Sequence, residues 1–121
     1  SARVFADLYG TLKRDVLQAQ ESGKHVVLVI DTQGAFFVKQ SLPAITIFIA
    51  PPSMEELKRR LKERNTDKVH TIEERLSWAK REMERKGAYD YFVINDDLEI
   101  AYKVLKSIFI AEEHRRSDAT A

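Results

Sequence analysis

The chain has 121 residues, of which 44% are hydrophobic and 32% are charged, a balance typical of one globular domain. Its net charge of +1 provides no strong field for nucleic acid or an acidic membrane, and the absence of cysteine excludes disulfides and thiolate-bound metals. The three histidines match no ligand spacing, so we expect no metal site. No apolar run approaches the ~20 residues needed to cross a bilayer, and we expect a cytoplasmic protein.

The first predicted element is a helix over 11–22 that ends at Gly23, a typical residue just past a helix end. Three short runs rich in Val, Ile and Phe follow at 25–30, 44–50 and 91–94. They do not alternate with polar residues, which is the pattern of strands covered on both faces of a parallel sheet.

Helical patterns separate these strands, over 32–42, 53–63 and 71–85, and a last helix opens at Asp96. The second and third begin with Ser-Met-Glu-Glu and Thr-Ile-Glu-Glu, capping boxes whose side chains satisfy free backbone N–H groups. Strands alternating with helices predict right-handed crossovers and a parallel sheet. We expect the highly charged segment 54–86 to form an excursion from that sheet. The inward stripe of the last helix is predicted to be Leu98, Ala101, Leu105 and Ile108.

Polar residues directly after the predicted strands mark where a ligand would bind, because ligands of parallel sheets lie beyond the carboxyl ends of the strands. Asp31 either caps the following helix or accepts hydrogen bonds from a ligand such as the guanine edge, with its adjacent N1–H and N2–H₂ groups. Gly34 either lets a ligand approach the backbone or is a helix packing point.

Six arginines lie in the charged excursion, and most of them fit a solvated helix face with pairs such as Glu56–Arg60. Arg64 and Arg75 differ, because one closes a helix and the other lies in the first turn of the next. A helical hairpin would bring both guanidinium groups to one point, where they suit phosphate oxygens.

The chain contains no G-x-x-x-x-G-K-[ST] motif and only four glycines. Without that loop, no backbone nest, lysine or Mg²⁺-binding hydroxyl holds a triphosphate. We therefore expect that this chain does not catalyse phosphoryl transfer alone.

Several short motifs in order resemble the guanylate kinases, which transfer a phosphoryl group from ATP to GMP and give ADP and GDP. The resemblance covers about residues 3–115. Its motifs are Leu8-Tyr9-Gly10-Thr11, Ile30-Asp31-Thr32-Gln33-Gly34-Ala35, Phe48-Ile49-Ala50-Pro51-Pro52-Ser53, Arg64-Asn65-Thr66, Glu74-Arg75-Leu76 and Val93-Ile94-Asn95-Asp96-Asp97-Leu98.

On the GMP side, the resemblance implies that the hydroxyls of Tyr9 and Thr11 bind GMP, the tyrosine at its phosphate. Asp31 matches the acid that reads the guanine edge, and Gly34 matches the point where the family's backbone passes the nucleotide. The resemblance thus favours the ligand-binding interpretation of Asp31 over the cap.

On the ATP side, Arg64 and Arg75 match the lid arginines that clamp the phosphates during catalysis. Asn95 matches the residue beside the adenine of ATP. The excursion 54–86 would be the lid, and its closure would exclude water from the transfer.

The implied fold is α/β, a parallel sheet with flanking helices of the P-loop nucleoside monophosphate kinase type, in incomplete form. About three strands and five to six helices are expected, with residues 1–10 a remnant of the GMP-binding subdomain and 11–121 the core that contains the lid. In the family, a central strand lies between those at 25–30 and 44–50. A missing amino-terminal segment or a second copy of the chain would complete the sheet, or the remaining strands would pair with each other instead.

Mg²⁺ is expected for the complete enzyme, with no ligand in this chain, because Val29-Ile30-Asp31 stands where the family often has Asp-Ile-Asp. Two alternatives stay open: a catalytically silent guanylate kinase-like interaction module, and a monophosphate kinase that prefers another base. The presence of Asp31, Arg64, Arg75 and Asn95 favours an active enzyme.

Overall fold

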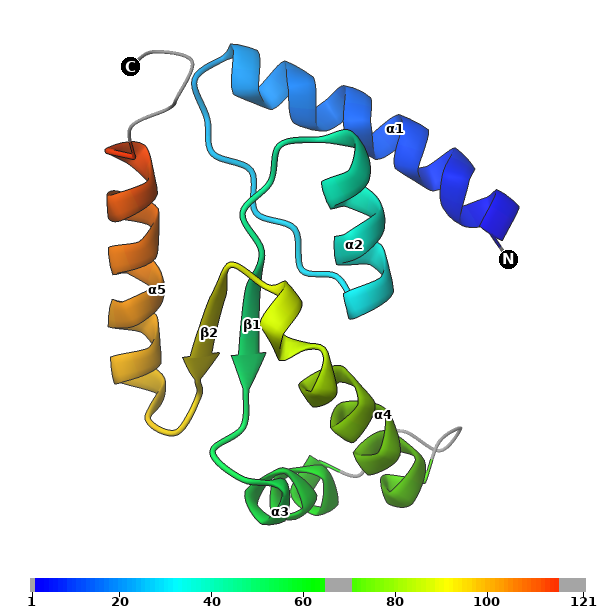
Figure 1. The fold of residues 1–121 in the computed structure, drawn as a ribbon, viewed down its shortest axis with the longest axis vertical. Helices are drawn as coiled ribbons and strands as arrows, with labels where there is room; N and C mark the ends of the chain where they lie inside the picture. Colours follow the sequence, from blue (N-terminus) through cyan, green and yellow to red (C-terminus); the bar gives the residue numbers. More distant parts are fainter. Residues whose placement is uncertain (1, 65–70, 116–121) are drawn as a thin grey trace. The chain divides into compact units, whose positions relative to one another are not determined.

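The computed structural model describes residues 2–64 and 71–115, with side chains from residue 12 onward within those ranges. The chain divides into two units, 1–45 and 46–121. Figure 1 labels their helices and strands. In the described ranges it contains five α-helices and two strands, which is an incomplete α/β fold. The predicted fold class is confirmed, with one strand fewer than expected.

The first unit begins with helix α1, Ala2–Glu21, which starts earlier than the predicted residue 11. At its end the Lys24 N–H donates to the Ala19 carbonyl at 3.1 Å, and Gly23 has a φ of +82°. This left-handed conformation lets the chain turn back over the last helical carbonyls, and glycine adopts it without steric cost. The prediction that Gly23 ends the helix is confirmed.

The predicted strand at 25–30 is wrong for this structure. The backbone between α1 and the next helix forms no strand, and β1 and β2 of the second unit make up the sheet found in the described residues. Val29 is 95% exposed and Val27 is 61% exposed. A strand requires hydrogen bonds to a neighbouring strand, and these apolar residues have none among the residues described.

Helix α2, Thr32–Ser41, confirms the helix predicted over 32–42. Its last bond runs from the Leu42 N–H to the Val38 carbonyl at 2.9 Å. Leu42 is extended, as expected for a residue before proline, so Pro43 ends the helix.

The second unit contains a parallel sheet of two strands, β1 (Ile47–Ala50) and β2 (Tyr91–Ile94). Both were predicted, β2 with the same bounds and β1 three residues shorter at its start than the apolar run at 44–50. In the register, Phe48 is opposite Phe92 and their rings are stacked with centroids 5.8 Å apart. Ala50 and Val93 are 1% and 4% exposed, so the core of this unit lies along the two strands.

Helix α5, Leu98–Glu113, packs against β2. Ile108 is buried, as the predicted stripe requires, whereas Leu98 is 75% exposed and does not face inward. Leu98 is the first residue of the helix and follows the end of a four-residue strand. The sheet is too short to cover that turn.

Helices α3, Met54–Arg64, and α4, Ile72–Glu84, form the connection between the two strands and pack on each other (Figure 1). Neither helix has a fully buried residue within its bounds. This agrees with the expectation that the segment 54–86 leaves the sheet. A short 3₁₀ turn, Lys86–Ala88, leads into β2.

Candidate functional site

Asp31 lies directly before α2 and caps it. Its Oδ1 accepts a hydrogen bond from the Gly34 N–H at 2.8 Å, and its main-chain carbonyl accepts from the Ala35 N–H at 2.9 Å. The cap interpretation is therefore confirmed. The cap uses one carboxylate oxygen of an exposed side chain, and a carboxylate has a second oxygen that can accept from a ligand. Recognition of guanine stays a prediction.

Gly34 is buried in the first turn of α2. A Cβ atom there would lie 3.1 Å from Asp31 Oδ1 and 3.4 Å from the Cβ of Ile30. The absence of a side chain thus lets the Asp31 carboxylate reach its N–H donor, which favours the packing interpretation. The approach of a nucleotide to this backbone stays a prediction.

Tyr9 and Thr11 lie in α1, and their side chains fall outside the part of the chain whose side chains are described. The predicted GMP hydroxyls are therefore not placed. The predicted boundary between residues 10 and 11 falls within this continuous helix, and the subdomain assignment stays a prediction.

Asn95 follows the last residue of β2 and continues the hydrogen bonding of the sheet. Its N–H donates to the Ala50 carbonyl at 2.7 Å, and its own carbonyl accepts from Arg60 Nη1 at 3.0 Å. The residue is half-buried. Its backbone is thus bonded to β1 and to α3, which fixes the position from which its side chain extends.

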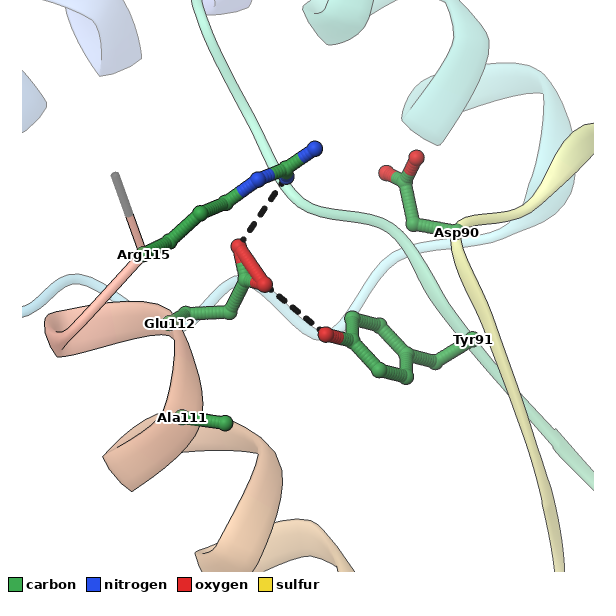
Figure 2. A pocket seen from close by; sticks show the side chains of 5 residues that line it. All are labelled: Asp90, Tyr91, Ala111, Glu112 and Arg115. Carbon is green, nitrogen blue, oxygen red and sulfur yellow. Dashed lines mark hydrogen bonds and ion pairs between the residues drawn. The ribbon is translucent and has the colours of Figure 1, made fainter. Parts of the chain in front are cut away.

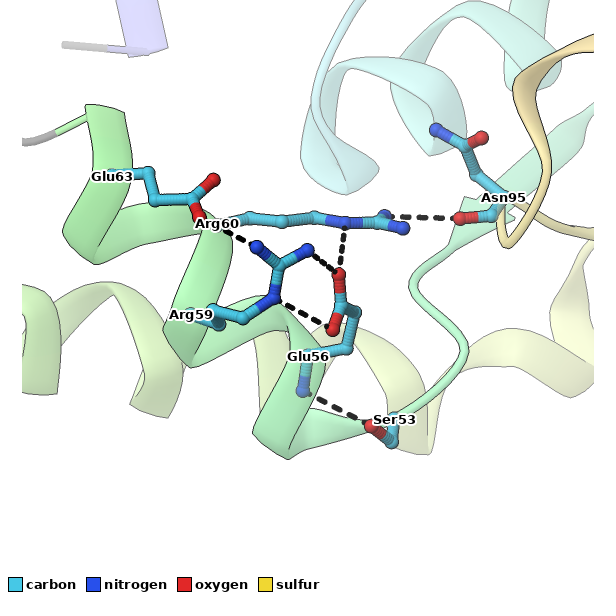
Figure 3. Close-up of polar contacts among 6 residues, drawn as sticks. All are labelled: Ser53, Glu56, Arg59, Arg60, Glu63 and Asn95. Atoms are coloured by element: carbon cyan, nitrogen blue, oxygen red, sulfur yellow. Dashed lines mark hydrogen bonds and ion pairs between the residues drawn. The ribbon is translucent and has the colours of Figure 1, made fainter.

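Four charged side chains of α3 form a network, which Figure 3 shows together with Ser53 and Asn95. Glu56 accepts from Arg59 and, at 3.1 Å, from Arg60 Nε, while Glu63 accepts from Arg59. The predicted Glu56–Arg60 pair is confirmed. The hydrogen bond from Arg59 lowers the pKa of Glu56, and the Glu56 carboxylate in turn raises the pKa of Arg59.

Sequence reasoning did not detect the contact from Arg60 to Asn95. Helical spacing predicts the pair with Glu56, since the two residues are four apart. The second contact spans 35 residues and depends on how α3 leaves the sheet. No local pattern contains that information.

Arg64 and Arg75 take the places expected from the sequence, at the end of α3 and in the first turn of α4. Arg64 is exposed and Arg75 is half-buried. The helices that carry them pack on each other. Residues 65–70, which join the two helices and include Asn65 and Thr66 of the motif, lie outside the described residues, so the convergence of the two guanidiniums stays a prediction.

A shallow pocket lies at the other end of β2 and is shown in Figure 2. The Tyr91 hydroxyl donates to Glu112 Oε2 at 2.8 Å, and Arg115 Nη1 lies 3.2 Å from Glu112 Oε1. The bond to Glu112 raises the pKa of Tyr91, because it stabilises the neutral phenol, and burial adds to this effect. The remaining lining residues are Asp90 and Ala111.

The described residues hold no group of three or more His, Asp or Glu side chains arranged to bind a metal ion. None of the described helices combines the length and the apolar character that a membrane crossing requires.

Known proteins resemble this chain over most of its length. The sequence profile described as guanylate kinase matches residues 1–112. Guanylate kinase from Chlamydia trachomatis serovar D is 49% identical over 114 residues, which are 94% of this chain and 56% of that protein. Guanylate kinase from Protochlamydia amoebophila is 50% identical over 115 residues, 95% of this chain and 58% of that protein.

Among solved structures, the crystal structure of guanylate kinase from Anaplasma phagocytophilum matches with a TM-score of 0.69 at 34% identity. The aligned region is 84% of this chain and 48% of the Anaplasma phagocytophilum chain. This chain spans about half the length of the curated relatives it matches. Because the profile matches nearly the whole chain and both sequence and fold agree with solved relatives, this chain belongs to the guanylate kinase family.

Proposed function

We propose that this chain carries one part of the nucleotide site of a guanylate kinase, which transfers a phosphoryl group from ATP to GMP and gives ADP and GDP. The observation that carries the proposal is a family match that runs through every motif from Tyr9 to Asn95. The chain has no glycine-rich phosphate loop. Without such a loop it does not turn over substrates alone.

On the GMP side, Asp31 accepts the paired N–H groups of guanine and Tyr9 and Thr11 supply hydroxyl donors. The cap of α2 supports this role, because it holds the Asp31 carboxylate at the helix start through Oδ1. A carboxylate held in one orientation loses little entropy when it binds a ligand. The absence of a Cβ at Gly34 preserves that orientation.

On the ATP side, Asn95 lies beside the adenine, and Arg64 and Arg75 stabilise the charge of the transferring phosphoryl group. Phosphoryl transfer depends on positioning and on such cationic donors. Helices α3 and α4 act as the lid, which excludes water when it closes. Their lack of fully buried residues supports this role, because a segment with little core packing moves at low energetic cost.

Mg²⁺ accompanies ATP in phosphoryl transfer and neutralises charge on the phosphates. Among the described residues no group of three or more His, Asp or Glu side chains is arranged to bind a metal ion, and we assign no Mg²⁺ ligand to them.

The edge of β1 supports the need for a further segment. The Thr46 and Ala50 carbonyls accept from the N–H groups of Tyr91 and Asn95, so alternate residues of β1 bond to β2. By the geometry of parallel strands, Ile47 and Ile49 direct their main-chain groups to the opposite edge. No strand in the described part of the chain pairs there. We propose that a strand of a missing amino-terminal segment, or of a second copy, binds this edge.

The test is ADP release with GMP and ATP, measured on the chain alone and on a fusion behind the amino-terminal part of the Chlamydia trachomatis enzyme. We expect turnover by the fusion and none by the chain. Turnover by the chain alone would contradict the proposed inactivity. An inactive fusion, beside an active Chlamydia trachomatis control, would instead favour a silent interaction module.

Asp31→Asn in the fusion tests base recognition, because asparagine caps a helix about as well as aspartate but presents one fewer acceptor. We expect GMP binding to weaken by about 1–3 kcal/mol with unchanged unfolding. Asp97→Asn is the matched control, since Asp97 caps α5 through the Ile100 N–H at 3.1 Å. Unchanged GMP affinity in Asp31→Asn would limit Asp31 to its capping role.

A further inference from the structure

Glu56 lies in the first turn of α3 and is held there at its backbone. Its N–H donates to Ser53 Oγ at 3.0 Å, so the serine caps the helix (Figure 3). The Glu56 side chain is 26% exposed, and its carboxylate accepts from both Arg59 and Arg60. One carboxylate therefore sets the direction of two neighbouring guanidinium groups.

The two arginines differ in what else they reach. Arg59 is 58% exposed and pairs with Glu63 on the next turn of the same helix. Arg60 is 32% exposed, and its Nη1 donates to the main-chain carbonyl of Asn95 at 3.0 Å. Arg59 thus stabilises α3 locally, whereas Arg60 connects α3 to the end of β2.

We propose that Glu56 is a positioning residue that holds the Arg60 guanidinium against the Asn95 carbonyl. A guanidinium has five N–H donors in a rigid plane, so the bond from Nε to Glu56 fixes the direction of Nη1. Without the carboxylate, Arg60 and Arg59 would be adjacent cations that repel each other. The base of α3 is thereby fastened to the carboxyl end of β2.

This arrangement links the lid to the proposed ATP side. Asn95 also donates to the Ala50 carbonyl, so its backbone is held by β1 and by Arg60. The inference rests on the proposed function, in which Asn95 lies beside adenine. If the Arg60 guanidinium becomes mobile, KM for ATP should then rise while GMP binding stays unchanged. A general loss of folding would impair the binding of both nucleotides.

Glu56→Gln is the test variant, and Glu63→Gln is the matched control because Glu63 pairs with Arg59. The first measurement is ¹⁵N relaxation of the Arg60 Nε group in this chain, which reports its motion. We expect Arg60 Nε to become mobile in Glu56→Gln and to stay ordered in Glu63→Gln. If the Arg60 Nε group is equally ordered in Glu56→Gln and Glu63→Gln, the proposal is overturned.

The second measurement is KM in the fusion described above. Glu56→Gln is expected to raise KM for ATP roughly tenfold, as for the loss of one charged hydrogen bond, with KM for GMP unchanged. The conservative variant Glu56→Asp should restore part of the ATP effect. Equal increases for both nucleotides would overturn the link to the ATP side. If the unsubstituted fusion is inactive, the proposed function fails, and the Arg60 relaxation still decides whether Glu56 positions Arg60.

Discussion

Residues 25–30 and 47–50 are both rich in Val, Ile and other apolar side chains, yet the second run forms a strand and the first does not. The run at 47–50 pairs with β2 along its whole length. The run at 25–30 has no partner strand in the described residues, and Val29 is 95% exposed. An apolar, β-branched composition thus allows a segment to form a strand, but the strand forms only when a neighbouring strand pairs with it through hydrogen bonds.

The paired region is also fixed at both of its ends. Before β1, Thr46 and Asp90 bond to each other through side chains and main chain, and Thr46 is 7% exposed. After β2, the Asn95 N–H bonds to the Ala50 carbonyl. These contacts fix the register, since a one-residue slip would break both ends.

Asp90→Ala should have the largest effect on the paired region. The change removes the acceptor of the buried Thr46 N–H, which Asp90 Oδ2 meets at 2.9 Å. We expect a loss of about 2–3 kcal/mol in the free energy of unfolding, measured by urea denaturation. Asp90→Asn keeps an acceptor oxygen and should lose less. Equal stability of the alanine variant and the unsubstituted chain would show that register does not depend on this contact.

Valine-to-alanine substitutions in β2 and in the run at 25–30 test whether the two segments differ in burial. Val93 in β2 is 4% exposed and Val29 is 95% exposed. Val93→Ala should cost about 2 kcal/mol, from lost burial and the cavity left behind. Val29→Ala should change stability by less than about 0.5 kcal/mol. A comparable loss in both variants would mean that the run at 25–30 is covered in solution, by a second copy or another segment.

Tyr91→Phe is expected to have a smaller effect than Asp90→Ala or Val93→Ala, because it removes only the hydrogen bond to Glu112 at the start of β2. The pKa of Tyr91 is raised in the folded state, so this stabilisation is complete below the ordinary tyrosine pKa of about 10. It is lost as pH rises through the folded pKa. The stability difference between Tyr91→Phe and the unsubstituted chain should therefore shrink in alkaline buffer.

The phenolate absorbance of the unsubstituted chain, minus that of Tyr91→Phe, gives the Tyr91 titration directly. A midpoint at or below the ordinary tyrosine pKa would contradict the hydrogen bond to Glu112. If the difference in the free energy of unfolding between the unsubstituted chain and Tyr91→Phe stays constant across the alkaline range, that result would independently contradict the hydrogen bond to Glu112.

Local features of this fold could be read from the sequence because their causes lie within a few residues. The caps at Ser53 and Thr71 form as predicted, and each hydroxyl accepts from the N–H three residues on. The last helix differs, because its cap is Asp97 and not the predicted Asp96. Gly23 ends α1 for an equally local reason, its positive φ. Glu56–Arg60 follows from helical spacing.

Contacts that depend on distant segments could not be read in the same way. The bond from Arg60 to the Asn95 carbonyl and the exposure of Leu98 both depend on where a helix leaves or meets a short sheet. By contrast, the sequence pattern did place Arg64 at the end of α3 and Arg75 in the first turn of α4, because helix boundaries are local.

The amino-acid sequence was enough to predict the order of the helices, the caps at Ser53 and Thr71, the two strands that form, and the motifs that identify the family. The folded structure was needed to learn that 25–30 forms no strand, that Asp31 uses one oxygen to cap α2, and that Arg60 joins α3 to β2. The difference follows from the range of the interactions. A helix cap or an ion pair along a helix joins residues three or four apart in the sequence. A strand, or a contact between distant segments, forms only when a residue far away in the sequence provides the hydrogen-bond partner.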